Sequence, residues 1–175
     1  MKYLALLRGI NVGGNRKVPM AQLKLVFMAM HFTAVSTYIN SGNVIFGSPY
    51  RPDARTIEQE LEKAFGFFIE VLVLSQDEVV SVVNAIPADW HNDTEQKSDV
   101  VFLFDDIDAA DIVQKIGYRP EFETIRYVPH ALIMNINRKN QTRSCLLKIM
   151  GTPIYRRMTI RNVTTARKLA ELVSA

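Results

Sequence analysis

Apolar and polar residues follow one another along the chain in segments that predict a regular order of strands and helices. An uninterrupted apolar run over residues 3–7 predicts a buried strand, and apolar residues at helical spacing after Pro19 predict a helix. Two more strands, joined by Asn40-Ser41-Gly42-Asn43, precede a helix ended by Gly66 and a strand over 69–74. The first half therefore has the order β-α-β-β-α-β, which is typical of ferredoxin-like domains.

The second half repeats this order. A connecting helix, which starts at a Ser75–Glu78 capping box, and then a polar linker precede the second half. A further helix follows its last strand at the C-terminus. The predicted elements are a strand over 99–104, a helix capped by Asp108 and ended by Gly117, two strands flanking Val128-Pro129-His130, a short helix over 144–150 and a strand over 155–159. We therefore predict an α+β fold with two tandem ferredoxin-like halves, residues 1–75 and 99–175, joined by a connecting helix and linker over 76–98.

The predicted topology brings two polar segments of the first half together. A right-handed crossover makes the first two strands parallel, so the segment after strand one and the turn after strand two lie at the same end of the sheet. Strand three is expected to pair beside strand one. We therefore expect the segment Arg8–Lys17 to lie beside the turn Asn40–Asn43.

The segment Arg8–Lys17 has the composition of an anion-binding loop. It holds three glycines and three cationic residues, and consecutive glycines let successive N–H groups point toward one anion. Asn11, Asn15 and the Asn40–Asn43 turn add neutral donors. Arginine and asparagine near the C-terminus are weaker candidates, because a surface arginine and a helix N-cap explain each of them better than a ligand contact does. The candidate ligand-binding residues are Arg8, Asn11, Gly13, Gly14, Lys17, Ser41, Asn43, Arg161 and Asn162.

The glycine spacing in this segment matches neither of the two common nucleotide-binding fingerprints. It lacks the pattern G-x-G-x-x-G and the G-K-[ST] of a P-loop. A long turn shaped by glycines and satisfied by asparagine side chains is the structural alternative. No nucleophile lies in a pattern with a general base, so the sequence predicts a ligand site and leaves catalysis undecided.

The net charge of +3 conceals three blocks of charge. Residues 1–52 contain six Lys/Arg and no acid, residues 53–123 have a net charge of −12, and residues 124–175 have a net charge of +9. Basic ends of this kind are compatible with nucleic-acid binding, although the strands lack most of the aromatic residues that stack RNA bases. A structural or protein-binding module, with the blocks neutralising one another, is the third alternative.

Several other classes of protein are disfavoured. The single Cys145 lies among apolar residues and is expected to be a buried thiol. The scattered histidines predict no metal site, and nothing predicts a cofactor. No apolar segment approaches the length of a membrane helix or of a signal peptide, so we expect a cytoplasmic protein without a membrane partner. The sequence leaves the oligomeric state open.

Three motifs carry a resemblance to a known family. Arg8-Gly9-Ile10-Asn11-Val12-Gly13-Gly14, Ser41-Gly42-Asn43-Val44 and Thr159-x-Arg161-Asn162 resemble the bacterial domain-of-unknown-function family 1697. The resemblance implies two ferredoxin-like halves and no established activity. The chain departs from the family pattern at Asn40, where glutamine is common, and at Val163, where tryptophan is expected. The second departure removes a stacking surface near Arg161.

Overall fold

The structure is a computed structural model that describes residues 1–14 and 16–175. It divides into two compact units, which are described separately below. Unit 1 comprises residues Met1–Val79 and Leu169–Ala175, and unit 2 comprises Val80–Lys168. In the described part of the chain, no helix combines the length and hydrophobicity that crossing a membrane requires.

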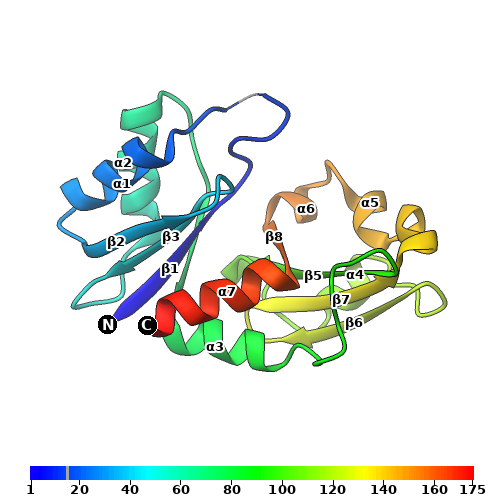
Figure 1. The fold of residues 1–175 in the computed structure, drawn as a ribbon. Helices are drawn as coiled ribbons and strands as arrows, with labels where there is room; N and C mark the ends of the chain where they lie inside the picture. The colour runs from blue at the N-terminus through cyan, green and yellow to red at the C-terminus, as the bar shows by residue number, and fades with distance from the viewer. Residues whose placement is uncertain (15) are drawn as a thin grey trace. The chain divides into compact units, whose positions relative to one another are not determined.

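Unit 1 contains a four-stranded sheet with the order β2-β3-β1-β4 (Figure 1). Each pair of neighbouring strands is antiparallel. Since β1 and β2 are both antiparallel to β3, they run parallel to each other, as the predicted crossover requires. The strands are β1 (Lys2–Leu7), β2 (Thr33–Tyr38), β3 (Asn43–Gly47) and β4 (Val71–Ser75).

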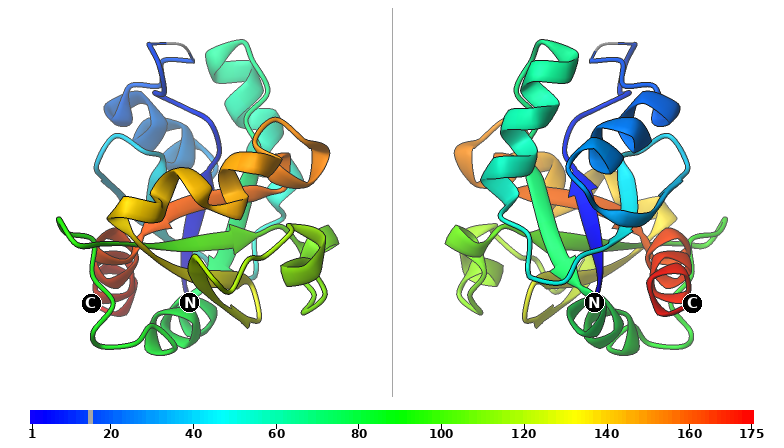
Figure 2. Two further views of the ribbon diagram at one scale, coloured as in Figure 1. Left: turned by 90° about the vertical axis from the view of Figure 1, so that its right-hand side faces the viewer. Right: turned by 90° about the vertical axis from the view of Figure 1, so that its left-hand side faces the viewer.

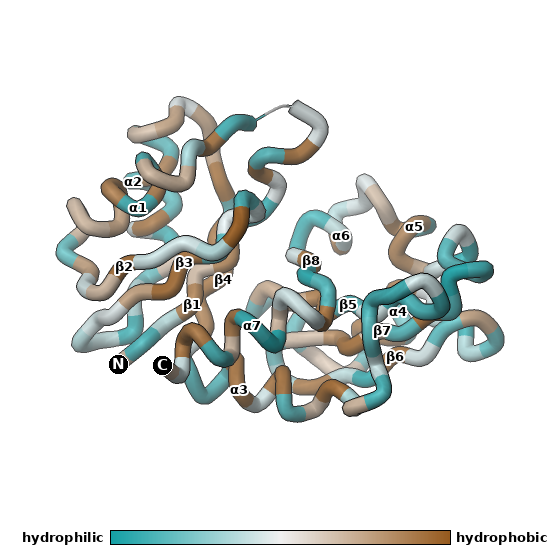
Figure 3. The backbone as a smooth tube through the Cα atoms, in the orientation of Figure 1, coloured by the Kyte–Doolittle hydropathy of each residue, from teal (hydrophilic) through white to brown (hydrophobic). Residues whose placement is uncertain are grey.

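Two helices, α1 (Met20–Ala29) and α2 (Ala54–Phe65), cover one face of this sheet (Figure 2). Alternate residues of β1, β3 and β4 point to that face, where they form a buried core with Leu23, Phe27 and Leu61. Figure 3 shows the hydrophobic character of these strands. Both ends of α2 are stabilised locally, because the Asp53 carboxylate accepts from the Thr56 N–H at 3.0 Å and Gly66 ends the helix at φ 77°.

Unit 2 contains a second four-stranded sheet with the equivalent order, β6-β7-β5-β8. All neighbouring strands are again antiparallel. Its strands are β5 (Gln96–Leu103), β6 (Glu123–Val128), β7 (Ala131–Asn137) and β8 (Met158–Asn162). The two sheets confirm the predicted α+β class.

Short helical segments cover one face of the second sheet, and two longer helices cross the boundary between the units. The short segments are η1 (Asp105–Ile107), α4 (Ile112–Lys115), η2 (Arg138–Arg143), α5 (Cys145–Ile149) and α6 (Pro153–Arg156), and the longer helices are α3 (Gln76–Asn84) and α7 (Val163–Ser174). The predicted capping box of α3 is present, because Ser75 N–H donates to Glu78 Oε2 at 2.7 Å and Glu78 N–H donates to Ser75 Oγ.

Two predictions for the second half are wrong. Asp108 caps no helix, because its carboxylate accepts instead from His130 N–H at 2.9 Å and from the Tyr127 hydroxyl at 3.1 Å. The last strand covers Met158–Asn162 rather than 155–159, because Pro153 begins the short helix α6 after the Thr152 N-cap. In addition, β5 begins at Gln96, within the segment predicted as linker.

Candidate functional site

Asn11 closes the predicted anion-binding loop onto itself and joins it to the neighbouring turn. Its side-chain oxygen accepts from Val18 N–H at 2.8 Å, and its amide nitrogen donates to the carbonyls of Val18 at 3.0 Å and Asn40 at 2.9 Å. Asn11 itself adopts φ 54°, a left-handed conformation that asparagine tolerates better than most residues. The loop and the Asn40–Asn43 turn therefore lie side by side, as the topology predicted.

The turn Asn40–Asn43 is held from within and packs tightly against β1. Asn43 is fully buried, and its amide donates to Tyr38 O and Ser41 Oγ, both at 3.0 Å. Gly42 adopts φ 73°, and its carbonyl accepts from Leu7 N–H at 2.8 Å. Asn43 and Gly42 thus fix the shape of the turn.

The three cations of the loop differ in their surroundings. Arg8 forms an ion pair across 3.6 Å with Glu70, which directly precedes β4. The Arg16 guanidinium lies 5.0 Å from the centre of the Phe67 ring and donates to the Phe68 carbonyl. Lys17 is exposed and forms no ion pair among the described residues. Of the three cations, Lys17 is therefore the one best placed to pair with a bound anion.

The loop leads directly into an uncapped helix. The N-cap of α1 is Pro19, no side chain among the described residues accepts from the first N–H groups, and the first turn has no acidic residue. A hollow of about 230 Å³ opens beside it, lined by Asn11, Lys17, Val18, Pro19, Met20 and Asn40. Uncapped N–H groups and the helix dipole both favour an anion at such a position.

Gly13 and Gly14 precede this hollow along the chain. Both are exposed and have positive φ, 61° and 79°, and a Cβ added to either would meet nothing within 4 Å. Glycine adopts this conformation without a steric penalty, and the predicted anion contacts of Gly13 and Gly14 stay predictions. Asn15, a predicted donor, lies outside the described residues.

Arg161 and Asn162 belong to unit 2 and have clear local roles there. Arg161 is buried, and its Nη1 donates to Thr159 Oγ1 at 3.1 Å and to Ile160 O at 2.8 Å. Burial lowers the pKa of Arg161 to about 10, which still leaves it charged at neutral pH. Asn162 Oδ1 accepts from Thr165 N–H at 2.8 Å and so caps α7. Their predicted ligand contacts stay predictions.

The first sheet has little aromatic surface of the kind that stacks RNA bases. Tyr3 and Phe46 lie in the core beneath α1 and α2. The opposite face carries the aliphatic side chains of Leu4, Leu6, Ile45, Leu72 and Leu74, all of them buried. Base stacking on this sheet is therefore disfavoured. In the described chain, no three His, Cys, Asp or Glu residues are grouped to hold a metal ion.

Two antiparallel sheets with helical layers define an α+β protein whose first unit carries a glycine-, asparagine- and cation-containing loop. The chain belongs to the family described as "Protein of unknown function (DUF1697)", whose model matches residues 1–132. This confirms the resemblance seen in the sequence. The match includes the loop and the Asn40–Asn43 turn, whereas Arg161 and Asn162 lie beyond it.

The chain is also similar to a solved structure, the conserved bacterial protein SP0830 from Streptococcus pneumoniae. The two are 26% identical, the similarity covers 98% of each chain, and the TM-score is 0.80. The similarity therefore includes both units. No curated protein matches this chain.

Proposed function

We propose that this protein binds a small anionic ligand, bearing a phosphate or a carboxylate, in the hollow at the N-terminus of α1. The observation that carries the proposal is the uncapped first turn of α1, which opens beside the exposed Lys17. An anion there would accept from the first backbone N–H groups of α1, which have no intrahelical partner, and it would be attracted by the helix dipole.

The candidate residues divide into contacts and supports. Lys17 lines the hollow and contacts the anion, Gly13 and Gly14 precede the hollow along the chain, and Asn11 and Asn43 hold the loop and turn in place. Ser41 lies at the adjoining turn, and Arg8 shares its charge with Glu70. A hydrogen bond from Lys17 contributes about 1.5–3 kcal/mol and the helix terminus about 0.3–1 kcal/mol. After the cost of association, a bare phosphate binds at about millimolar Kd.

Thermal-shift measurements with inorganic phosphate and phosphorylated metabolites test this proposal. Lys17→Ala should abolish stabilisation by the anion, whereas Lys24→Ala, an exposed lysine on α1, should retain it. Pro19→Asp supplies a side-chain carboxylate at the N-cap. That variant should be more stable without ligand and should no longer respond to phosphate. Equal responses of Lys17→Ala and Lys24→Ala, or no response at millimolar anion, would refute the proposal.

The basic end segments favour nucleic acid as the competing ligand. Residues 1–52 and 124–175 carry the excess of positive charge. Single-stranded binding through these segments would weaken with a logarithmic salt slope of about −0.7 per neutralised phosphate. Absence of oligonucleotide binding at low salt, together with a retained response to phosphate, would favour the small ligand. The third alternative, a structural or protein-binding module, predicts neither response.

We further propose that each unit is ferredoxin-like and that the protein is cytoplasmic. The repeated strand order and the helices between the strands support the first assignment. The lack of a long apolar segment in the sequence supports the second.

A further inference from the structure

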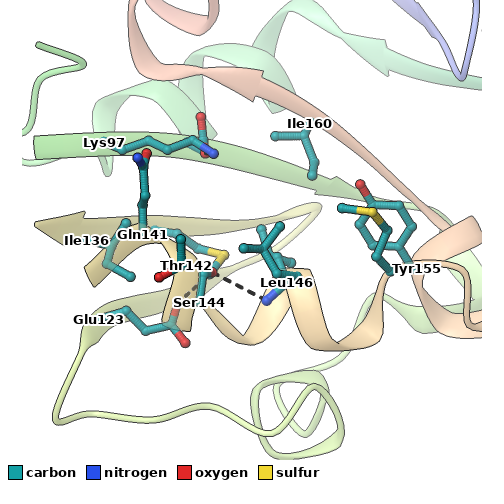
Figure 4. A pocket seen from close by; sticks show the side chains of 13 residues that line it. Lys97, Glu123, Ile136, Gln141, Thr142, Ser144, Leu146, Tyr155 and Ile160 are labelled. Atoms are coloured by element: carbon teal, nitrogen blue, oxygen red, sulfur yellow. Dashed lines mark hydrogen bonds and ion pairs between the residues drawn. The ribbon is translucent and has the colours of Figure 1, made fainter. Parts of the chain in front are cut away.

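Unit 2 contains a separate pocket of about 420 Å³ between its sheet and the segments η2, α5 and α6. Figure 4 shows Lys97 and Ile160 approaching it from β5 and β8, and Leu146 and Tyr155 from α5 and α6. Its volume falls in the range of small-molecule sites. All its lining residues belong to unit 2, so it is independent of the site proposed at Lys17.

The sheet register explains why charged residues line this pocket. In β5, Lys97 and Asp99 alternate onto the same face as the core residues Val101 and Leu103. Lys97 pairs with Ile136 of β7, which in turn pairs with Glu123 of β6. The strands therefore bring two acids and one lysine onto the rim of an otherwise hydrophobic face.

The pocket holds more buried negative charge than positive charge. Asp99 is 9% exposed, its carboxylate lies 3.3 Å from the Lys97 ammonium, and the positive charge of Arg138 also acts on it. Glu123 is 4% exposed and accepts from Ser144 Oγ and Cys145 N–H, both at 2.9 Å. Among the described residues, no cationic side chain forms an ion pair with Glu123. Burial raises the pKa of Asp99, as expected for a carboxylate that has lost solvent.

The rest of the lining is largely apolar. Met134, Leu146 and Ile160 form a hydrophobic surface next to the acids. Leu147 and Met150 also line the pocket, and they are 47% and 56% exposed. Exposed apolar side chains beside a pocket gain free energy when an apolar ligand covers them.

We propose that this pocket binds a small primary amine with an apolar body. The ammonium lies against Asp99, within the negative field to which Glu123 adds, and the apolar body covers Met134 and Leu146. A cation offsets the excess negative charge of Asp99 and Glu123, of which only Asp99 pairs with Lys97, whereas a ligand carboxylate would add a third negative charge. The apolar walls favour a hydrocarbon body over a hydrophilic one.

Paired probes of equal shape test this inference. The protein is titrated separately with benzylamine, hexylamine, benzyl alcohol and hexanol. Binding is followed by the backbone amide NMR shifts of residues that line the pocket. The amines should bind at least about tenfold more tightly than the alcohols, because one charge-assisted hydrogen bond is worth a factor of ten or more. Equal affinities for amine and alcohol, tighter binding of benzoate, or no binding of any probe at millimolar concentration would each overturn it.

Asp99→Asn keeps the size of the side chain and removes its charge. It should weaken amine binding by about tenfold and leave alcohol binding unchanged, so the alcohol also reports whether the pocket is still formed. Asp89→Asn, at an exposed acid of the same unit, is the matched control and should bind amines normally. Amine binding that survives Asp99→Asn unchanged would overturn the assignment of the ammonium to Asp99.

Discussion

Gly42→Ala is expected to destabilise the protein more than another glycine of the same backbone conformation. A Cβ added to Gly42 would lie 2.7 Å from Leu7 Cβ and 2.8 Å from Ile10 Cδ1, both of which belong to buried residues. Neither neighbour can move easily, because Leu7 is in the central strand β1 and Ile10 is in the core. The substitution therefore wedges the turn away from the strand.

The stability lost in Gly42→Ala has two contributions, backbone strain and overpacking, which a control variant separates. Left-handed backbone costs an alanine about 1–2 kcal/mol, and overpacking costs about 1–3 kcal/mol more. Gly66 adopts φ 77°, close to the 73° of Gly42, but a Cβ there meets nothing within 4 Å. Gly66→Ala therefore measures the backbone cost alone. The two variants share the same change in unfolded-chain entropy, which cancels in the comparison.

Urea denaturation of both variants and the parent protein gives the required free energies. Gly42→Ala should lose about 1–3 kcal/mol more stability than Gly66→Ala at an unchanged m-value. Equal losses of stability in the two variants would show that the loop and turn accommodate the added Cβ without overpacking. That result would refute the argument that Gly42 is required for close packing.

Substitutions at three further positions test other parts of the structure. Cys145 is buried and its pKa is raised to about 12, so stability should fall as pH rises above the thiol's ordinary 9.0. The folded protein keeps a proton that the unfolded chain loses, and Cys145→Ala should remove about 1.4 kcal/mol of that fall at about pH 10, measured by urea denaturation. Ile39 is half exposed at φ 50°, so Ile39→Asn should raise the free energy of unfolding by about 1 kcal/mol, and an unchanged value would argue against strain there. Asp53→Ala removes the cap of α2 and should cost about 1 kcal/mol of stability, which is measured as a lower melting temperature. Asp53→Ser supplies another capping side chain and should retain most of that stability.

Features that depend on neighbouring residues could be predicted from the sequence. The Ser75–Glu78 capping box joins residues three positions apart, and it is present. Asp108 was misassigned because its partners Tyr127 and His130 lie 19 and 22 residues away. A carboxylate near a predicted helix start favours a cap, and only the folded sheet supplies a stronger partner.

In the candidate sites, too, some features could be predicted from the sequence and others depend on the folded sheet. The sequence and topology together predicted that the Asn40–Asn43 turn lies beside Asn11, because strand order determines which ends meet. They could not predict that Glu70 reaches Arg8, since that ion pair depends on the register of β4 against β1. Asp99 and Glu123 were also missed. Single acids in predicted strands indicate no site until the register shows that both face one pocket.

The division of the chain into units has a consequence for biosynthesis. Unit 2 is one continuous stretch, Val80–Lys168, whereas unit 1 combines Met1–Val79 with Leu169–Ala175. Many multidomain chains complete their N-terminal domain first, while translation continues. Here the N-terminal sheet is made first, but its unit is complete only after residues 169–175 have left the ribosome. Unit 2 therefore has all its residues available earlier, although it is encoded later than most of unit 1.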